Sequence, residues 1–275
     1  MSEKFVYTMS DPELGWEILI ARPRVLAGIA RLKRADPNVE VAYASYASRH
    51  VLYQTVDKFI SVGGYSNWET YWENPSLKEY DGYKKLDYQN EAVDEYSYPL
   101  PKIDQWIEKA KGLMPQPYVT ISARLRIREG NRNFKSWGMI ASALESKGLK
   151  VICTSPRSGS PPVGVAYLED LIEKDDPDSM GIEMALHNGS EMSITTNTGA
   201  AGIMLMSNPK RFMIFGGAIG FKPGWDGMYD ILAKSQSYRT KFINFEVGTG
   251  GFAMADNDQI AHDVIGKACG ILGAK

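Results

Sequence analysis

The chain has 275 residues, of which 44% are hydrophobic and 23% charged, and its formal net charge at pH 7 is −2. This balance is typical of a soluble globular protein and gives no electrostatic support for a polyanionic partner such as nucleic acid. The length suits one large domain or two domains of ordinary size.

The expected compartment follows from the first residues and the cysteines. The start, Met-Ser-Glu-Lys, does not resemble a signal peptide, and no apolar run approaches the roughly 18 residues of a membrane-spanning helix. Cys153 and Cys269 lie in apolar stretches and are predicted to be core thiols rather than a disulfide. We therefore expect a cytoplasmic protein.

The first sixty residues predict a β-α-β-α-β unit. In chain order the pattern gives a strand at 5–9, a helix at 16–35, a strand at 39–46, a short helix at 48–56 and a strand at 58–62. Pro23 is expected to kink or split the first helix. Such alternation is typical of a parallel sheet with covering helices.

Residues 63–101 lose this periodicity and are rich in Tyr, Trp, Asn, Asp and Glu, so we interpret them as an irregular insert. The aromatic residues between Tyr65 and Trp106 have two equally supported interpretations. They form either a surface that stacks on flat or sugar-like ligands, or aromatic packing beneath a loop-rich insert. A helix at 103–112 and a Pro-containing linker at 113–117 follow.

A second α/β cycle occupies the remainder of the chain. Strands are predicted at 118–125, 149–154, 193–196, 210–215 and 241–247, and helices at 134–147, 180–188, 200–206, 228–234 and 256–272. We therefore predict an α/β fold with two Rossmann-like domains facing a cleft. The N-terminal domain is 1–112, with the aromatic insert at 63–101, and the C-terminal domain is 113–275.

One strand-turn-helix stretch in the second domain predicts an anion site. A β-branched strand runs into the small residues Asn197, Thr198, Gly199 and Ala200, and an apolar helix follows. The N–H groups at such a helix start point outward and bind phosphate, and small residues let a ligand approach the backbone. The alternative is a plain helix N-cap, a position that also favours Asn and Thr.

Basic residues follow the strand at 118–125. Arg124, Arg126 and Arg132, with Arg128, surround one strand end, and alternate residues such as Arg124 and Arg126 share a face. Ligands of α/β sheets bind at the carboxyl ends of strands, so we predict phosphate binding here, with Ser155 after the next strand as a further contact. The alternative is a solvated basic loop.

Several of these motifs together resemble a known family. They are Arg124-Leu-Arg126, Asn131-Arg-Asn133, Trp137 in a helix, the stretch from Ile194 to Ala201, and the loop Glu13-Leu-Gly-Trp-Glu17 with Pro23 six residues after Glu17. This set resembles the GT-B-fold glycosyltransferases, in particular their heptosyltransferase-like and fucosyltransferase-like branches. The chain departs from that pattern in carrying Glu17 where heptosyltransferases carry Asp. It also has Thr196-Asn-Thr-Gly-Ala-Ala201 where they have Asp-Ser/Thr-Gly-x-x-His.

The resemblance implies transfer of a sugar from a nucleotide-sugar, used as a co-substrate, to an acceptor hydroxyl without a cofactor. The second domain would bind the donor diphosphate through Arg132 and the Thr198 turn, and the first would supply the acceptor site and the base. Glu17 ranks first as that base, ahead of Glu13 and Asp11. The alternative is that these acidic side chains only stabilise a helix N-terminus through its dipole. The acceptor stays open among a glycan, a lipid-linked sugar, a protein and a modified nucleic-acid base.

No metal is expected, because the three histidines are far apart in sequence. Asp256-Asn-Asp258 lies at a predicted helix start and is interpreted as a cap, and the Asp residues of 174–178 as an acidic turn, rather than as the Asp-x-Asp motif of metal-dependent glycosyltransferases. Two other functions stay open. One is a nucleotide- or sugar-binding module without turnover, which the missing acid and His of the turn support. The other is a nicotinamide-dependent oxidoreductase that uses Gly248-Thr-Gly-Gly-Phe-Ala253, although too few residues follow this motif for a complete dinucleotide unit.

Overall fold

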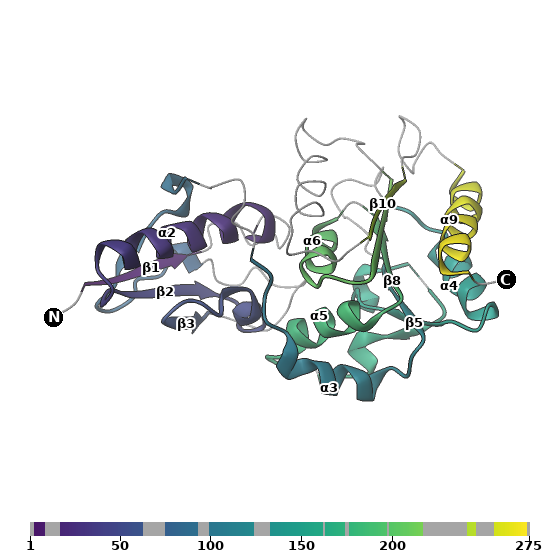
Figure 1. The fold of residues 1–275 in the computed structure, drawn as a ribbon, viewed down its shortest axis with the longest axis horizontal. Coiled ribbons are helices and arrows are strands. Elements are labelled where there is room, and N and C mark those ends of the chain that lie inside the picture. Colours follow the sequence, from purple (N-terminus) through teal and green to yellow (C-terminus); the bar gives the residue numbers. More distant parts are fainter. Residues whose placement is uncertain are drawn as a thin grey trace. The chain divides into compact units, whose positions relative to one another are not determined.

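The computed structural model describes residues 3–8, 17–62, 75–92, 99–123, 133–161, 163–173, 176–196, 198–216, 241–245 and 256–273. The chain forms two compact units, Met1–Ile103 with Asp175–Gly181, and Asp104–Lys174 with Ile182–Lys275 (Figure 1). The helix that follows residue 103 groups with the second unit rather than with the predicted domain 1–112. The roles predicted for the two domains stay predictions.

The first unit is built on a four-stranded parallel sheet in the order β3-β2-β1-β4. Its strands are β1 (Lys4–Thr8), β2 (Glu40–Ser45), β3 (Lys58–Ser61) and β4 (Lys84–Leu86). The helical elements are a π-type turn η1 (Glu17–Ala21), the helix α2 (Arg22–Ala35) and the 3₁₀ segment η2 (Ala47–Tyr53). The predicted β-α-β-α-β unit is therefore confirmed.

Pro23 divides the first helical segment as predicted. It lies in the first turn of α2, where a helix N–H has no intrahelical acceptor, so the missing proline N–H costs nothing there. The five residues before α2, Glu17–Ala21, form the π-type turn η1 instead of extending the α-helix. Such turns are rare in proteins as a whole, and those that occur are often found at functional sites.

The insert contains more regular structure than the sequence analysis predicts. β4 pairs in parallel with β1, and the short 3₁₀ segments η3 (Pro75–Leu77) and η4 (Tyr88–Asn90) flank it. Tyr80 and Tyr83 pack against a small apolar cluster of the first sheet, and Tyr88 is fully buried. For Tyr80, Tyr83 and Tyr88 the structure therefore favours packing over an exposed stacking surface, whereas the aromatic residues at 65–72 and 96–98 lie outside the described residues.

The second unit contains a six-stranded parallel sheet in the order β10-β9-β8-β5-β6-β7. Its strands are β5 (Tyr118–Ser122), β6 (Lys150–Cys153), β7 (Ala166–Tyr167), β8 (Met192–Thr196), β9 (Arg211–Phe215) and β10 (Lys241–Phe245). Its helices are α3 (Asp104–Leu113), α4 (Trp137–Ser146), α5 (Ser179–Gly189, of which Ser179–Gly181 belong to the first unit), α6 (Gly199–Met206) and α9 (Asn257–Leu272), with short 3₁₀ segments η6 (Arg157–Gly159) and η7 (Leu168–Asp170). The predicted strands and helices are confirmed, except the helix at 228–234, which lies outside the described residues.

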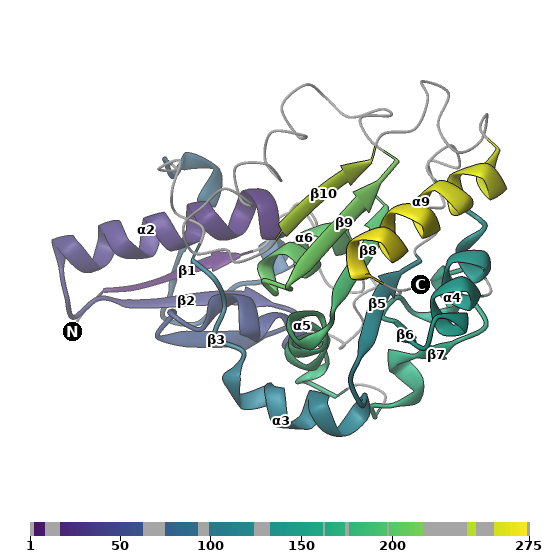
Figure 2. The ribbon, with the colours of Figure 1, turned by 45° about the vertical axis from the view of Figure 1, so that its right-hand side comes forward.

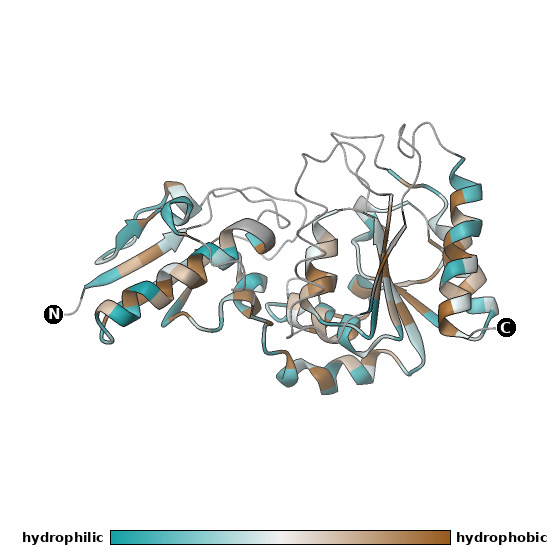
Figure 3. Cartoon of the chain, turned by 45° about the horizontal axis from the view of Figure 1, so that its top comes forward, coloured by the Kyte–Doolittle hydropathy of each residue, from teal (hydrophilic) through white to brown (hydrophobic). Residues whose placement is uncertain are grey.

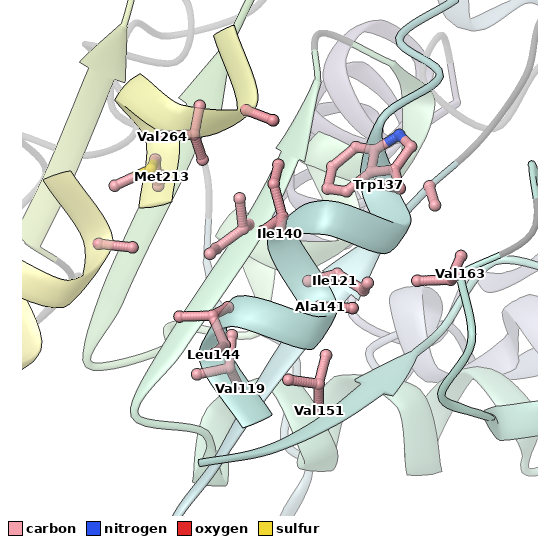
Figure 4. Packing of buried hydrophobic residues seen from close by; sticks show 14 of the residues in the cluster. Val119, Ile121, Trp137, Ile140, Ala141, Leu144, Val151, Val163, Met213 and Val264 are labelled. Atoms are coloured by element: carbon pink, nitrogen blue, oxygen red, sulfur yellow. The ribbon is translucent and has the colours of Figure 1, made fainter. Parts of the chain in front are cut away.

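Helices cover both faces of this sheet. In Figure 2, α4 and α9 lie on one face, and Figure 1 shows α5 and α6 on the other. Alternate residues of the central strands, such as Ile121 and Ile194, enter one apolar cluster with α4 and α9. The labelled side chains of Figure 4 belong to this cluster, and Figure 3 shows the hydrophobic residues gathered inward in the helices and strands. This core fixes the strands whose ends carry the candidate site.

Three aromatic rings pack at right angles or tilted angles near one end of that cluster. Phe134 lies 5.5 Å from Trp137 and 5.0 Å from Phe215, measured between ring centroids. Cys153 is buried here, which raises the pKa of its thiol to about 11, and Cys269 is partly buried against the same cluster. Both cysteines are free thiols. None of the helices in the described ranges is both long and apolar enough to pass through a membrane.

Candidate functional site

The second sheet has a topological switch point between β5 and β8. From β5 the chain moves to β6 on one side, and it later returns to β8 on the other side. The helices that follow these strands, α4 and α6, cover opposite faces, so the connections diverge (Figure 1). In open α/β sheets, ligands bind outside the carboxyl ends of strands at such a point. Ser122 and Thr195 face each other in register there.

Hydroxyl side chains collect along this edge of the sheet. We call them the hydroxyl edge: Ser122, Thr154, Ser155, Thr195, Thr196 and Thr198, all buried. The Ser122 and Ser155 hydroxyl oxygens are 2.7 Å apart, and Thr195 Oγ1 donates to the Ser122 carbonyl at 3.2 Å. The ends of β6, β5 and β8 are therefore joined by hydrogen bonds beside the start of α6.

Thr198 occupies the N-cap position of α6, yet its side chain makes no capping hydrogen bond. Its Oγ1, like those of Thr196 and Thr154, is buried and has no hydrogen-bond partner among the described residues. In contrast, Asp256 at the start of α9 caps its helix by accepting from the N–H groups of Asp258 and Gln259. The side chain of Thr198 therefore does not cap α6 in this structure, and its buried hydroxyl could bind another group.

Four of the predicted donor-site residues lie at this edge: Ser155, Thr198, Gly199 and Ala200. Gly199, which has no side chain, and Ala200 begin the first turn of α6, where a helix N–H in general has no acceptor four residues earlier. Their contact with a ligand stays a prediction. Arg124, Arg126, Arg132 and Asn197 lie outside the described residues.

The start of α4 adds features that the sequence analysis missed. Ser136 precedes this helix without capping it, and its hydroxyl donates to Asp258 Oδ1 at 2.6 Å. The backbone N–H of Lys135 donates to Asn257 Oδ1 at 3.1 Å, so the starts of α4 and α9 are tied together. The buried Trp137 Nε1–H has no acceptor in the described part of the chain, and in Figure 4 it faces away from Ile140. Ser136, a residue type that favours the position before a helix, was the sequence signal available for this corner.

In the first unit, the predicted base Glu17 is fully buried as the first residue of η1. One carboxylate oxygen accepts hydrogen bonds from Tyr43 Oη at 2.9 Å and Ser45 Oγ at 3.0 Å. The other accepts from the guanidinium of Arg49, which is also buried. Glu13 and Asp11 lie outside the described residues.

Neutral phenols line this carboxylate. Burial, followed by the charge of Glu17, raises the pKa of Tyr43 well above its ordinary value, and the same causes raise the pKa of Tyr53. The two rings stack with centroids 3.6 Å apart. Glu17 is therefore enclosed by hydrogen-bond donors and reaches no solvent, so an acceptor hydroxyl reaches it only if surrounding groups move. Its role as a base stays a prediction.

Within the described ranges, no group of three or more His, Cys, Asp and Glu side chains is placed to hold a metal ion. The sequence motifs predict a reaction without a metal on other grounds, and this stays a prediction.

Comparison with known proteins identifies the fold. No protein-family model and no curated protein matches the chain. A glycosyl transferase of family 9 from Veillonella parvula is 11% identical with a TM-score of 0.56, over 98% of this chain and 97% of that one. The E. coli ADP-heptose lps heptosyltransferase II is 10% identical with a TM-score of 0.54, over 95% and 97%. The E. coli heptosyltransferase WaaC, solved with ADP, is 10% identical with a TM-score of 0.52, over 95% and 98%.

These similarities cover nearly the whole chain, so the fold is that of the GT-B glycosyltransferases. The α/β class and the resemblance to heptosyltransferases predicted from the sequence are confirmed at the level of the fold. Identities of this size show the fold alone, and the chemistry has to be argued from the site.

Proposed function

We propose that the chain is a glycosyltransferase that moves a sugar from a nucleotide-sugar donor to an acceptor hydroxyl without a metal. The observation that carries this proposal is the uncapped start of α6, where the Thr196 and Thr198 hydroxyls have no partner among the described residues. It lies at the switch point of β5 and β8, in a chain with the fold of sugar-transferring enzymes.

The chemistry at this edge suits a departing diphosphate. When the glycosidic bond to the donor breaks, negative charge develops on the leaving phosphate oxygen. Backbone N–H groups of a helix start and hydroxyl donors stabilise such charge without a metal ion. In the proposed complex the first turn of α6 and Thr198 hold one phosphate, and Arg124, Arg126 and Arg132, which follow β5 in the sequence, supply positive charge. One structural relative was solved with ADP, so a nucleoside diphosphate is the appropriate probe.

The acceptor hydroxyl has to lose its proton during transfer, and we assign this step to Glu17. Tyr43, Ser45 and Arg49 orient its carboxylate in the first unit. The acceptor itself stays open among a glycan, a lipid-linked sugar, a protein and a modified base, and we place the reaction in the cytoplasm.

The first test is nucleotide binding by calorimetry with UDP, GDP, ADP, CMP, dTDP and NAD. We expect one nucleoside diphosphate to bind, and Thr198→Val to raise its dissociation constant by about ten- to a hundredfold. The reason is that a hydrogen bond to a charged group contributes about 1.5–3 kcal/mol. Ser207→Ala is the matched control, because this buried hydroxyl donates to the Ile203 carbonyl at the other end of α6.

Equal affinities in Thr198→Val and Ser207→Ala would refute the donor site. Binding of NAD alone would move attention to Gly248–Ala253, which lies outside the described residues. The enclosure of Glu17 favours a second candidate, a nucleotide-sugar-binding module without turnover. Binding of a nucleotide-sugar with neither transfer nor hydrolysis over a panel of acceptors would support that module instead of the enzyme.

A further inference from the structure

A buried polar cluster lies on the α5 side of the second sheet, directly below the hydroxyl edge. We call it the His187 network: Thr120, Glu183, His187, Ser190 and Ser193, all buried. His187 Nδ1 is 2.8 Å from Thr120 Oγ1 and 3.3 Å from Ser193 Oγ, and these two hydroxyl oxygens are 2.7 Å apart. The other ring nitrogen, Nε2, lies 3.5 Å from Glu183 Oε1. One side chain of α5 thus contacts both β5 and β8.

The opposite face of the same two strands is apolar. Val119 and Ile121 of β5, with Ile194 of β8, belong to the large cluster packed under α4 and α9. Strand residues alternate between faces, so the sequence places hydroxyls toward α5 and hydrocarbon toward α4. Buried polar groups contribute little net stability compared with apolar residues of similar volume, so this pattern calls for another explanation.

The network and the hydroxyl edge follow one another along the strands. Thr120 and Ser193 are paired in register, and two residues further on Ser122 and Thr195 are paired in the same register and on the same face. Thr196 and Thr198 then lead into α6. The polar pairs therefore run from the middle of the sheet to the predicted phosphate site without an intervening apolar layer.

We propose that His187 is a positioning residue for the start of α6. At the switch point the covering helices diverge, so helix packing constrains the ends of β5 and β8 less than elsewhere. The contacts of the imidazole Nδ1 with the Thr120 and Ser193 hydroxyls, and the hydrogen bond between these two hydroxyls, fix the two strands in distance and rotation. Apolar contacts do this less strictly. The network thereby holds the Thr198 turn in the geometry that presents its donors. The ligand part of this inference rests on the proposed function, whereas the geometric part does not.

The test compares local opening at α6 with global stability. Thr120→Val removes one hydroxyl and keeps the side-chain shape. Ile194→Val, on the apolar face of β8, is the matched control, because it weakens the same sheet without touching the network. We expect amide hydrogen exchange in the first turn of α6 to be about tenfold faster in Thr120→Val than in the control, after correction for global unfolding. Thr120→Ser restores a hydroxyl and is expected to restore slow exchange.

Equal exchange in Thr120→Val and Ile194→Val would overturn the positioning role and leave His187 as part of the packing alone. Ser193→Ala provides the same comparison if Thr120→Val does not fold. A second readout is the dissociation constant for the nucleoside diphosphate bound by the unmodified chain, expected to rise about tenfold in Thr120→Val and to stay unchanged in the control. If the unmodified chain binds no nucleotide, the proposed function fails, and the exchange comparison still decides the positioning role.

Discussion

At the scale of single residues, Glu17 shows why activity alone is a poor test of a catalytic assignment. Its carboxylate and the Arg49 guanidinium form a fully buried ion pair. Removal of one partner leaves the other charge buried without compensation, which costs about 3–5 kcal/mol. We therefore expect Glu17→Gln to lower the free energy of unfolding, measured in urea, by about 3–5 kcal/mol. An inactive Glu17 variant indicates a lost base only where the protein is shown to be folded.

Two further variants make this prediction specific. Glu108→Gln removes an exposed partner of Lys111 in α3 and is expected to leave the midpoint of unfolding nearly unchanged. The double variant Glu17→Gln with Arg49→Met removes both charges and is expected to recover part of the lost stability. If Glu17→Gln unfolds at the same urea concentration as Glu108→Gln, the buried pair does not stabilise the first unit.

At the scale of elements, the insert contacts α2 through Glu91, which lies so close to Gly28 that a larger residue there would overlap with it. Tyr7 of β1 donates to Glu91 at 2.5 Å, and Arg31 of α2 donates to the same carboxylate at 2.7 Å. The Arg31 guanidinium lowers the pKa of Glu91, and burial raises the pKa of Tyr7. A Cβ at Gly28 would come within 2.7 Å of the Tyr7 ring carbon Cζ and 2.8 Å of the Glu91 carboxyl carbon.

Gly28→Ala is therefore expected to destabilise the chain by about 1–3 kcal/mol, since overpacking outweighs the gain of about 1 kcal/mol in helix propensity. Gly266→Ala in α9 is the control, because among the described residues nothing beyond the local backbone of its own helix lies within 4 Å of a Cβ at that position. It is expected to stabilise by about 1 kcal/mol. Urea denaturation measures the change in the free energy of unfolding, which is expected to have opposite signs in the two variants. A stabilising Gly28→Ala would show that Tyr7 and Glu91 shift at little cost to make room for the methyl group.

Elements with strong local patterns were predictable, and those that depend on distant partners were not. The runs that became β2, β8 and α9 were predicted from their own residues to within a residue or two. β4, in contrast, is a short run with two lysines, and it is a strand because it pairs with β1, about eighty residues earlier. The enclosure of Glu17 likewise depends on Arg49 and Tyr43 from other elements. The uncapped state of Thr198 cannot be predicted either, because its residue type also suits a capping role.

At the scale of the whole molecule, the buried tyrosines predict loss of stability in alkali. Burial is the first cause of raised pKa values at the buried Tyr7, Tyr43, Tyr53 and Tyr118 and at the partly buried Tyr83, and the pKa values of Tyr83 and Tyr118 are about 12. Below the unfolded-state pKa of about 10, these phenols are protonated in both states and the contribution is fully present. As the pH rises further, the unfolded chain releases protons that the folded chain retains, so stability falls with pH.

Between pH 10 and 12, the slope of the free energy of unfolding against pH reports how many phenols stay protonated in the folded chain but not in the unfolded chain. Each such phenol contributes roughly one proton to that difference. Tyr118→Phe removes one of them, together with a hydrogen bond of 2.8 Å to the Leu186 carbonyl. We expect this variant to be less stable than the unmodified chain at pH 8. Above pH 10 its stability should fall less steeply with pH, with a slope smaller by the contribution of about one proton. Urea denaturation at several pH values measures both effects. Parallel curves for the two proteins would mean that Tyr118 titrates alike in the folded and unfolded chains, and that alkaline sensitivity arises from the other buried tyrosines.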